Sequence, residues 1–453
     1  MREEKVLWEP RRAVPIDARA DVCVCGGGCT GVFAAVRAAR LGCSVILCEE
    51  TNILGGAAVN GLVNIWHSLC DIYDRDRIIA GLTAEVLDRL EQRGALTRST
   101  ARSNANTFNP SELAFLLDRL AAENKIEVRL HTKVCGVSVG DKHVRAVFIE
   151  DGDGRKAIEA GFFIDCTGDG DLMRRLGVPY YTDDRIQPPS SCFYLLGNTD
   201  GVNIPKLVHE HGAEFGLADD WGWSTPIPGC PGITMRADNH VFGVRCDRAR
   251  DLTEAEIVGR KQMSAFLDLV QKYGRKDTTY SIVNQASYIG IRETVHYPTL
   301  FKAERLPLLS GTRYPDAVLN GTYPSDVHHG DRDNMGITFW YLDGTRRTVY
   351  GKGTRVETGS WREENGLSGE PAAYYQVPFS ILVQKDFENI IPAGRMVNAD
   401  SGAFGALRVM VNLNQLGEAA GCAAAEALDT GKAVYELDGA AVRALLRKGG
   451  SAL

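Results

Sequence analysis

Short, uninterrupted apolar runs alternate with a helical spacing of apolar residues at the start of the chain. Val22-Cys23-Val24-Cys25 and the run from Ser44 to Cys48 predict two buried strands. The alanine-rich stretch between them, Val32 to Leu41, stops at Gly42 as a helix does. We therefore predict a β-α-β unit over residues 21 to about 60.

The same spacing predicts further elements along the chain. Apolar residues recur at helical intervals from Asp76 to Leu90 and from Ser111 to Ala122, where Ser111 fits a helix start. Another helix is expected to begin near Thr253, with Glu256 completing a capping box, and to stop before Gly274. A long helix is expected from about Leu407 to Leu428. Strands are predicted at Ile126–Leu130, Lys133–Val139, Val144–Glu150 and Phe162–Cys166.

A glycine-rich turn, Gly26-Gly27-Gly28-Cys29-Thr30-Gly31, joins the first strand to the first helix. This spacing is typical of a pyrophosphate cradle: the first glycine permits the turn, the second lets the backbone approach the phosphates, and the third packs the helix on the strand. The second strand ends in Glu49, an acid placed to hold a pair of ribose hydroxyls. A glycine turn without a ligand is the structural alternative, but the complete order of elements favours a bound dinucleotide.

Two more glycine turns indicate which dinucleotide is bound. Leu54-Gly55-Gly56-Ala57-Ala58 follows the acid closely, where an NAD-binding unit would continue into a helix, so FAD is preferred over NAD. Thr167-Gly168-Asp169-Gly170-Asp171 follows the last predicted strand, and a glycine at the carboxyl end of a strand belongs in the ligand crevice of an open α/β sheet. Alone, the third turn could be an ordinary Asp/Gly turn; beside the other two, it is interpreted as a third wall of the FAD site.

The C-terminal part is expected to return to the cofactor. Pro392 and Ala393 lead into Gly394-Arg395, and a helix N-terminus near Arg408-Val409-Met410 is expected to point at the pyrimidine edge of the flavin. A positive dipole end and an arginine there would raise the reduction potential, because reduced flavin carries negative charge near N1. Close packing of a helix rich in small residues is the plainer interpretation of this segment.

The composition argues against several other functions. The 453 residues are enough for two domains, and the net charge of −7 without a Lys/Arg-rich run makes a nucleic-acid partner unexpected. No stretch approaches the roughly 20 apolar residues of a membrane span, and no apolar signal core is seen, so we expect a cytoplasmic protein. The 12 cysteines include no Cys-x-x-Cys pair, which argues against a redox disulfide, a zinc ribbon or an iron–sulfur cluster. Those in predicted strands are interpreted as small apolar residues: Cys23, Cys25, Cys48 and Cys166.

Together these motifs resemble one known family over nearly the whole chain. The sequence is similar to the bacterial FAD-dependent oxidoreductase family, within the glutathione-reductase-like flavoproteins. The segments that carry the resemblance are 26–31, Leu54-Gly55-Gly56 with Asn60-Gly61-Leu62-Val63, Ile164 to Asp171, Gly290 to Thr294, Gly321 to His328, and Pro392 to Arg395 with Arg408-Val409-Met410. The resemblance implies an α/β fold in which an FAD-binding, Rossmann-like domain of the glutathione-reductase type carries an inserted α+β substrate domain.

Prolines and mixed polar residues around Tyr180 to Pro189 place a domain boundary there. We predict the first part of the FAD-binding domain over residues 1–185, with a helical cap at about 65–122. The substrate domain is predicted over 186–374, and the C-terminal part of the FAD-binding domain over 375–453. In the wider class the C-terminal strand commonly ends in Gly-Asp, whose Asp holds the ribityl chain; Arg395 takes that place here, so the ribityl contact is expected from elsewhere.

Cofactor contacts are expected from the glycine turns, the acid, one later strand and the C-terminal block. The expected contact residues are Gly26, Gly28, Cys29, Thr30, Gly31, Glu49, Glu50, Gly55, Gly56, Ala57, Val134, Thr167, Gly168, Asp169, Gly394, Arg395, Arg408, Val409 and Met410.

Candidate catalytic residues fall mainly in the predicted substrate domain. His328, in an Asp-x-His element that the family shares, could manage the proton that accompanies hydride transfer, or could be a hydrogen-bonded structural histidine. Arg292 could anchor a carboxylate or polarise a carbonyl, or could simply pair with Glu293. His67 could face the flavin or finish a loop.

Two further features of this domain have more than one interpretation. Asp326, His328 and His329 could form a metal site, but adjacent histidines rarely converge on one ion, so no metal is expected. Trp221 and Trp223 could roof a substrate cavity, although aromatic residues in such a loop more often pin it to the core.

These interpretations predict an FAD-dependent oxidoreductase that transfers a hydride between flavin N5 and a small polar substrate such as a hydroxy or keto compound. One alternative is a flavoprotein electron-transfer subunit of a larger complex, and another is a tRNA-modifying flavoprotein. No second G-x-G-x-x-G is present, so the electron partner is left open between NAD(P)H bound directly, another protein, a quinone and dioxygen. A homo-oligomer is compatible with the sequence.

Overall fold

The computed structural model describes residues 7–99, 106–220, 222–353 and 355–453. The largest sheet of this described part has seven strands: β1 Ile16–Cys25, β2 Val45–Cys48, β6 Glu127–Arg129, β7 Lys133–Gly140, β8 His143–Asp151, β9 Gly154–Asp165 and β20 Ile390–Pro392. Their order is β6-β2-β1-β9-β8-β7, with β20 also beside β9. The pairs within β6, β2, β1, β9 and β20 are parallel, and those of β7 and β8 are antiparallel. A mixed α/β fold with a parallel sheet is therefore confirmed.

The β-α-β unit lies where it was predicted, with α1 at Cys29–Arg40 between β1 and β2. Successive side chains of β1 point to opposite faces of the sheet. Val22 and Val24 contribute to one hydrophobic core, which contains α1, and Cys23 and Cys25 contribute to a second core on the other face. Because both faces are covered, the strand is an uninterrupted apolar run, as is typical of parallel sheets.

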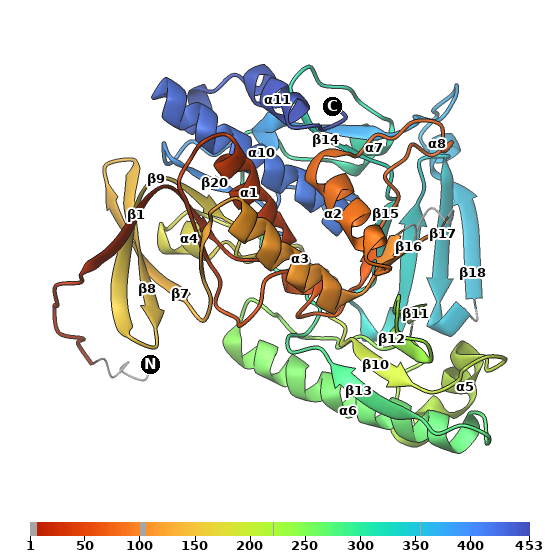
Figure 1. Cartoon of the computed structure of the whole chain (residues 1–453). Helices are drawn as coiled ribbons and strands as arrows, with labels where there is room; N and C mark the ends of the chain where they lie inside the picture. Colours follow the sequence, from red (N-terminus) through yellow and green to blue (C-terminus); the bar gives the residue numbers. More distant parts are fainter. Residues whose placement is uncertain (1–6, 100–105, 221, 354) are drawn as a thin grey trace, which may run out of the picture.

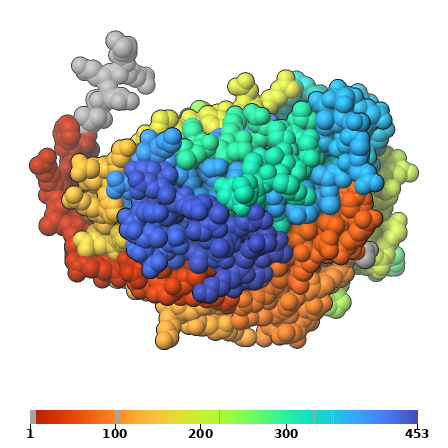
Figure 2. All heavy atoms as spheres, turned by 90° about the horizontal axis from the view of Figure 1, so that it is seen from above, coloured from red at the N-terminus to blue at the C-terminus, as the bar shows by residue number. Residues whose placement is uncertain are grey.

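Helices form a layer over one face of the sheet (Figure 1). Besides α1, this layer contains α2 Gly81–Gln92, α3 Pro110–Glu123, α10 Met410–Thr430 and α11 Gly439–Lys448. α10 packs against α1, α2 and α11, and α3 packs against α1 and α2. Figure 2 shows the C-terminal residues, in blue, directly beside the red and orange N-terminal ones.

Glycines on α10 explain how closely it approaches α1. An ideal Cβ on Gly417 would lie 2.2 Å from the Thr30 carbonyl oxygen, and one on Gly421 would lie 2.4 Å from that of Ala34. Any side chain at these positions would push the two helices apart. The small residues of α10 therefore serve close packing against α1, which was the plainer of the two interpretations given for this segment.

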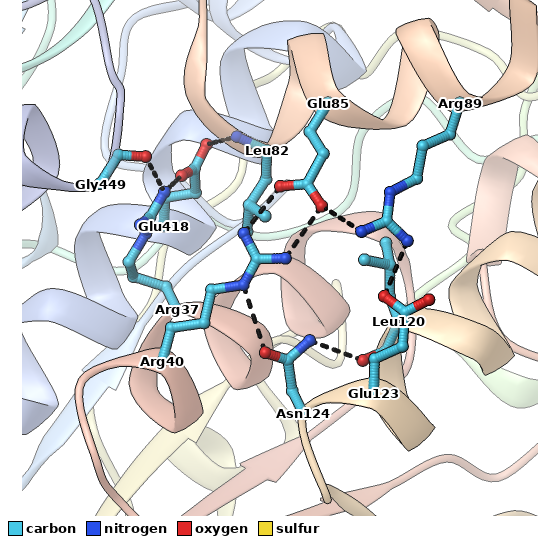
Figure 3. A network of polar contacts seen from close by, with 10 residues as sticks. All are labelled: Arg37, Arg40, Leu82, Glu85, Arg89, Leu120, Glu123, Asn124, Glu418 and Gly449. Carbon is cyan, nitrogen blue, oxygen red and sulfur yellow. Dashed lines mark hydrogen bonds and ion pairs between the residues drawn. The ribbon is translucent and has the colours of Figure 1, made fainter. Parts of the chain in front are cut away.

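A buried ion pair links three of these helices (Figure 3). The Arg37 guanidinium on α1 contacts the Glu418 carboxylate on α10, and both side chains are almost completely buried. Arg37 also donates to the Gly449 carbonyl oxygen at 3.0 Å, and Glu418 accepts the Leu82 N–H of α2 at 3.0 Å. The surrounding pairs of Figure 3, such as Arg89 with Glu123, are more exposed.

Residues 193–285 and 325–360 each contribute the strands of one four-stranded antiparallel sheet. One has the order β11-β12-β10-β13, and α6 packs along it at the bottom of Figure 1 through the core that includes Phe193 and Phe266. The other has the order β15-β16-β17-β18. Their bounds are β10 Phe193–Leu196, β11 Trp223–Pro226, β12 Ile233–Ala237, β13 Ser281–Gln285, α6 Ala249–Tyr273, β15 Ser325–His328, β16 Gly336–Trp340, β17 Thr345–Tyr350 and β18 Arg355–Ser360.

Shorter elements complete the described fold. β3, β5 and β4 form a three-stranded sheet, and β14 pairs with β19. The bounds are β3 Ile65–Trp66, β4 Leu96–Arg98, β5 Asn106–Phe108, β14 Ala317–Gly321, β19 Tyr375–Pro378, α4 Asp171–Arg175, α5 Ile204–His211, α7 Arg305–Leu309, α8 Trp361–Glu364 and α9 Ser401–Leu407. None of the helices in the described residues is long and apolar enough to span a bilayer.

Two helix starts were predicted wrongly. α2 begins at Gly81 rather than near Asp76, because Gly81 adopts φ +63° and donates its N–H to the Gly450 carbonyl, which a local pattern cannot anticipate. α6 begins at Ala249, so Thr253 lies inside the helix and donates its hydroxyl to the Ala249 carbonyl. Its expected capping partner, Glu256, instead accepts the N–H of Ile289.

Other boundaries differ by smaller amounts. α3 is capped by the Asn109 side chain, with Pro110 rather than Ser111 as its first residue. The helix expected from Leu407 is interrupted, since α9 ends at Leu407 and α10 starts at Met410. The strand expected from Phe162 is the end of the longer β9, and Cys166 lies just after it.

Candidate functional site

Three glycine turns meet at the carboxyl ends of β1 and β9. Gly28 of the first turn forms a parallel bridge with Gly55 of the second, and Gly55 donates its N–H to the Gly27 carbonyl at 2.8 Å. The third turn follows Cys166, whose N–H bonds the Cys25 carbonyl at 2.7 Å. Segments that are far apart in the sequence thus enclose one space.

The glycines of the first turn differ in what excludes a side chain. An ideal Cβ on Gly31 would lie 1.9 Å from the Gly26 carbonyl oxygen, and Gly26 itself has φ +102° and would meet the Cys166 carbonyl at 2.3 Å. At Gly28, by contrast, the nearest atom is the Gly56 Cα at 3.9 Å. The packing of the protein therefore does not require a glycine at position 28. Because Gly28 lines the cavity, a Cβ there would instead take up space inside it.

A cavity of about 240 Å³ lies where the three turns meet. It collects most of the residues expected to contact the cofactor: Gly26, Gly28, Cys29, Thr30, Glu49, Glu50, Gly55, Gly56, Ala57, Val134, Thr167, Gly168, Asp169, Gly394, Arg395 and Met410. Three expected contacts do not line it. Gly31 packs inside the turn and lines neither cavity of the site, and Arg408 and Val409 line the adjoining cavity described below.

Glu49 is held firmly at the edge of this cavity. Its Oε2 accepts the Gly27 N–H at 2.6 Å, and its Oε1 accepts the N–H and the hydroxyl of Thr51 at 2.8 and 2.7 Å. The side chain of Glu50 also lines the cavity, and it pairs with Lys133 at 3.0 Å. A buried carboxylate with lone pairs to spare is suited to accept ribose hydroxyls.

Arg395 lies on the wall that both cavities of the site share. Its guanidinium contacts the Asp169 carboxylate, which also accepts the Thr294 hydroxyl at 2.6 Å. Arg395 donates to the Ile291 carbonyl at 3.3 Å as well. Asp169 thus provides a carboxylate on the cavity wall from the third glycine turn, although position 395 holds an arginine.

A second cavity of about 360 Å³ adjoins the first. The residues that line both are Ala57, Gly290, Ile291, Arg395, Met410 and Leu413. All three candidate catalytic residues, His67, Arg292 and His328, line this second cavity. Trp223 lines it too, and Trp221 lies outside the described residues.

Asp326 organises the polar end of the second cavity. Its Oδ2 accepts the Tyr323 hydroxyl at 2.6 Å and lies 3.3 Å from Arg408 Nη2, while Oδ1 lies 3.3 Å from His328 Nε2. His67 packs over the Tyr323 ring, with ring centroids 4.0 Å apart. The Asp326 carboxylate therefore lies between Tyr323, Arg408 and His328, and its Oδ1 forms no hydrogen bond within the described residues.

His328 is neutral in this setting. Burial holds its pKa well below 6.5, and the positive charge of Arg292 lowers it further. Its buried Nδ1 has no hydrogen-bond partner in the described part of the chain. His328 lines the second cavity, and a neutral imidazole can accept a proton.

Arg292 does not form the ion pair with Glu293 that the sequence offered as an alternative. Its Nη1 donates to the Pro188 carbonyl at 2.8 Å and to the Ser190 hydroxyl at 2.6 Å. Glu293 instead accepts the Gln187 N–H at 3.0 Å. Burial lowers the pKa of Arg292 to about 10, so the side chain stays protonated at neutral pH.

His329 serves a different purpose from its neighbour. Its ring nitrogens contact the Asn334 carbonyl at 3.1 Å and the Thr338 hydroxyl at 2.9 Å, and it lines neither cavity. Among the described residues, no group of three or more His, Cys, Asp or Glu side chains could hold a metal ion.

Several wall residues were not anticipated. In the first cavity they include Thr51, Asn60, Thr132, Lys133, Asp171, Tyr288 and Ile289, and in the second Val63, Ile65, Ser190, Cys192, Ala237, Tyr323, Ile337 and Phe339. Most come from positions without a motif of their own, so no local signal marked them. Asn60, Val63, Asp171 and Tyr323 stood in segments that carried the family resemblance, which was a pointer to them.

A dinucleotide fits this arrangement on the chain's own geometry. The N-terminus of the 12-residue helix α1, at Cys29 and Thr30, lines the first cavity, and its first N–H groups favour an anion such as pyrophosphate. Gly28 leaves space that the protein does not fill, and Glu49 lies at the end of β2. The flavin end of FAD would then meet the wall that the two cavities share.

Comparisons with known proteins agree with this geometry. The model of a family described as "FAD dependent oxidoreductase" matches residues 21–446. No curated protein matches the chain.

Solved structures show distant likenesses. A geranylgeranyl bacteriochlorophyll reductase-like protein from Thermoplasma acidophilum has 11% identity and a TM-score of 0.47, over 96% of this chain and 82% of that one. The p-nitrophenol 4-monooxygenase PnpA from Pseudomonas putida DLL-E4 has 13% identity and a TM-score of 0.43, over 96% of this chain and 88% of that one.

Proposed function

The chain belongs to the FAD-dependent oxidoreductase family, and from this premise we propose that it transfers a hydride between flavin N5 and a small hydroxy or keto compound. The observation that carries the proposal is the pair of adjoining cavities: one has a dinucleotide cradle, and the other holds His328, Arg292 and His67. A volume of about 360 Å³ is near the lower end of the range for ligand pockets, which favours a small substrate.

The first cavity would hold FAD through groups named above. The first turn of α1 would bind the pyrophosphate, Glu49 the adenosine ribose, and Asp169 and Arg395 the part of the cofactor nearest the shared wall. When bound, FAD supplies a two-electron acceptor or donor at N5 of its ring. Met410 lines both cavities at the start of α10, so the positive end of that helix faces the shared wall.

The second cavity would manage the proton. We assign this role to the imidazole of His328, which accepts a proton from the substrate hydroxyl in the oxidative direction and returns it in the reductive one. The Asp326 carboxylate lies 3.3 Å from Nε2 of this ring, and Tyr323 and Arg408 contact the same carboxylate. Many of the remaining wall residues are apolar.

The domain arrangement of the resemblance is part of this proposal. β20 and α10 return to the sheet and helices of the first 165 residues, which supports an FAD-binding domain of the glutathione-reductase type, built from 1–185 and 375–453. The antiparallel sheets that begin at β10 and β15 support a substrate domain over 186–374.

Anaerobic titration of the purified holoenzyme tests the function. We expect a panel of hydroxy acids and sugars to contain a class that bleaches the visible absorption of the flavin. Colour without bleaching by any reductant in the panel would contradict the oxidative reaction and favour an electron-transfer subunit.

A pair of variants tests the role of His328. His328→Gln should slow flavin reduction by about 100- to 10,000-fold, because it removes the proton acceptor, while FAD stays bound. The adjacent His329→Gln is the matched control and should leave the rate within a few-fold of the wild type. Equal rates for His328→Gln and the wild type would overturn the assignment.

A further inference from the structure

We infer that the substrate carries a carboxylate and that Arg292 binds it. This inference deepens the proposed function and rests on it, because it names the class of molecule that the second cavity accepts.

Arg292 has no ion-pair partner among the described residues, although the negative charges of Asp326 and Asp220 act on it from a distance and oppose the lowering of its pKa by burial. Arg408 pairs with Asp326, and Arg395 pairs with Asp169. Arg292 contacts only a carbonyl and a hydroxyl, and no described carboxylate forms an ion pair with it. A desolvated charge without a counter-charge is costly, so a ligand that brings one negative charge would bind here favourably.

Other buried arginines of this protein are treated differently. Arg37 contacts Glu418, and Arg236 bonds both oxygens of Asp238 at 2.7 and 2.9 Å. The fully buried Arg37 and Arg236 thus each receive a carboxylate, whereas the partly buried Arg174 and Arg443 donate to carbonyl oxygens. The absence of a carboxylate at Arg292 coincides with a cavity that a ligand can enter.

The geometry of Arg292 leaves suitable donors available. Its Nη1 is occupied by Pro188 and Ser190, which hold the planar group in place. Its Nε and Nη2 make no hydrogen bond to the part of the chain that the structure describes. These two nitrogens lie on one edge of the guanidinium, and such an edge binds both oxygens of a carboxylate.

The remaining wall describes the rest of the substrate. Away from Asp326 the cavity is lined largely by apolar side chains, which include Val63, Ile65, Trp223, Ile337 and Phe339. An apolar group packs there without leaving polar atoms unpaired. The preferred class is therefore a small 2-hydroxy or 2-oxo acid with an apolar side group.

A bound carboxylate would also act on His328. Burial and the positive charges of Arg292 and Arg408 keep this histidine neutral, together with the nearby His240 and His329. A negative charge beside Arg292 opposes that effect and raises the pKa of His328. The histidine would become a stronger proton acceptor when the correct substrate is present.

Calorimetry on the oxidised holoenzyme tests the inference without turnover. The probes are phenylacetate and phenylacetamide, which match in size, differ in charge and lack an oxidisable hydroxyl. We expect the wild type to bind the acid about tenfold or more tightly than the amide, the size of one charge-assisted hydrogen bond. Arg292→Met should remove this preference, and Arg292→Lys should retain part of it.

The control is Arg260→Met, on an exposed part of α6, which should keep the full preference. FAD content and melting temperature establish that each variant is folded. Equal binding of acid and amide by the wild type would overturn the inference, as would failure of the acid to bind or an unchanged preference in Arg292→Met. Loss of FAD from Arg292→Met with the acid preference intact would show instead that Arg292 serves the cofactor.

The titration of the preceding section separates the two failures. Bleaching by neutral hydroxyl compounds as readily as by acids would overturn the carboxylate and keep the proposed function. Acid-selective binding without bleaching by any compound would keep the carboxylate and overturn the proposed function.

Discussion

Two regions of the molecule compensate the charge of an arginine in different ways. Between α1, α2 and α10, the fully buried Arg37 is matched inside the chain by Glu418 and by the Gly449 carbonyl (Figure 3). In the second cavity, the partly buried Arg292 donates its hydrogen bonds, within the described residues, to neutral acceptors such as Ser190. The scaffold completes its own charge balance, whereas the cavity leaves a charge for a ligand to complete.

The glycines of the first turn repeat this difference. Gly31 is required by the fold, because a Cβ there would collide with the Gly26 carbonyl. Gly28 has space within the protein and borders the cavity that we assign to FAD. Arg292 and Gly28 thus share one property: each borders a cavity and leaves either a charge or a space that a ligand can fill.

The largest effect is expected at the scaffold ion pair. Glu418→Gln leaves the Arg37 charge buried without its counter-charge, which should lower the free energy of unfolding by about 3–5 kcal/mol. Chemical denaturation followed by circular dichroism measures this change. Removing both charges with Arg37→Met and Glu418→Gln should restore part of the loss, because the desolvation cost of Arg37 disappears.

The matched control is an exposed pair of the same layer. Arg89 and Glu123 are 2.7 Å apart but remain 30% and 42% exposed, so Glu123→Gln should cost at most about 1 kcal/mol. A similar loss for Glu418→Gln and Glu123→Gln would break the comparison.

A smaller effect, on binding rather than on stability, is expected at Gly28. Gly28→Ala should weaken FAD binding by roughly 5- to 150-fold, because its methyl group overpacks a filled site by about 1–3 kcal/mol. The apoprotein should melt near the wild-type temperature, since Gly28 has an extended backbone with φ −62° and an open Cβ direction. Fluorescence titration of the apoprotein with FAD gives the affinity.

Gly31→Ala provides the contrast, because its Cβ would meet backbone rather than the ligand. It should lower the melting temperature of the apoprotein itself. If both variants destabilised the apoprotein equally, Gly28 would be required by the fold, as Gly31 is, and not by the bound cofactor.

Local patterns predicted the β-α-β unit and the glycine turns because each depends on neighbours in the sequence. The start of α2 was missed because Gly450 and Glu418 fix it from the far end of the chain. Thr253 and Glu256 matched a capping box, yet Ile289 uses the Glu256 carboxylate through a tertiary contact.

The same distinction applies to the candidate site. Glycine and acid motifs marked most of the first cavity, since backbone turns have a local signature. Arg292 and His328 were visible as residues, but their partners were not. The contact of Asp326 with Arg408 and the hydrogen bond of Glu293 to Gln187 depend on packing between distant segments, which the sequence does not encode locally.

The smallest effect is a shift in the pH dependence of flavin reduction. Protonated His328 cannot accept the substrate proton, so the rate should fall as the pH drops through its pKa, which lies below 6.5 in the wild type. Burial is the main cause of this low pKa, and Arg292, His240, Arg408 and His329 lower it further, while the Asp326 carboxylate lies 3.3 Å from Nε2. Arg292→Met removes one positive charge, makes protonation easier and should move the acid limb to higher pH.

A neutral hydroxyl substrate is needed for this measurement, so that carboxylate binding does not differ between the enzymes compared. Stopped-flow reduction of the wild type, Arg292→Met and the surface variant Arg260→Met across the acid range would give the three limbs. The surface variant should coincide with the wild type. If the acid limb of Arg292→Met coincided with that of the wild type, the charge of Arg292 would not affect the pKa of His328. The difference between Arg37 in the scaffold and Arg292 in the cavity would then affect only the binding of the ligand.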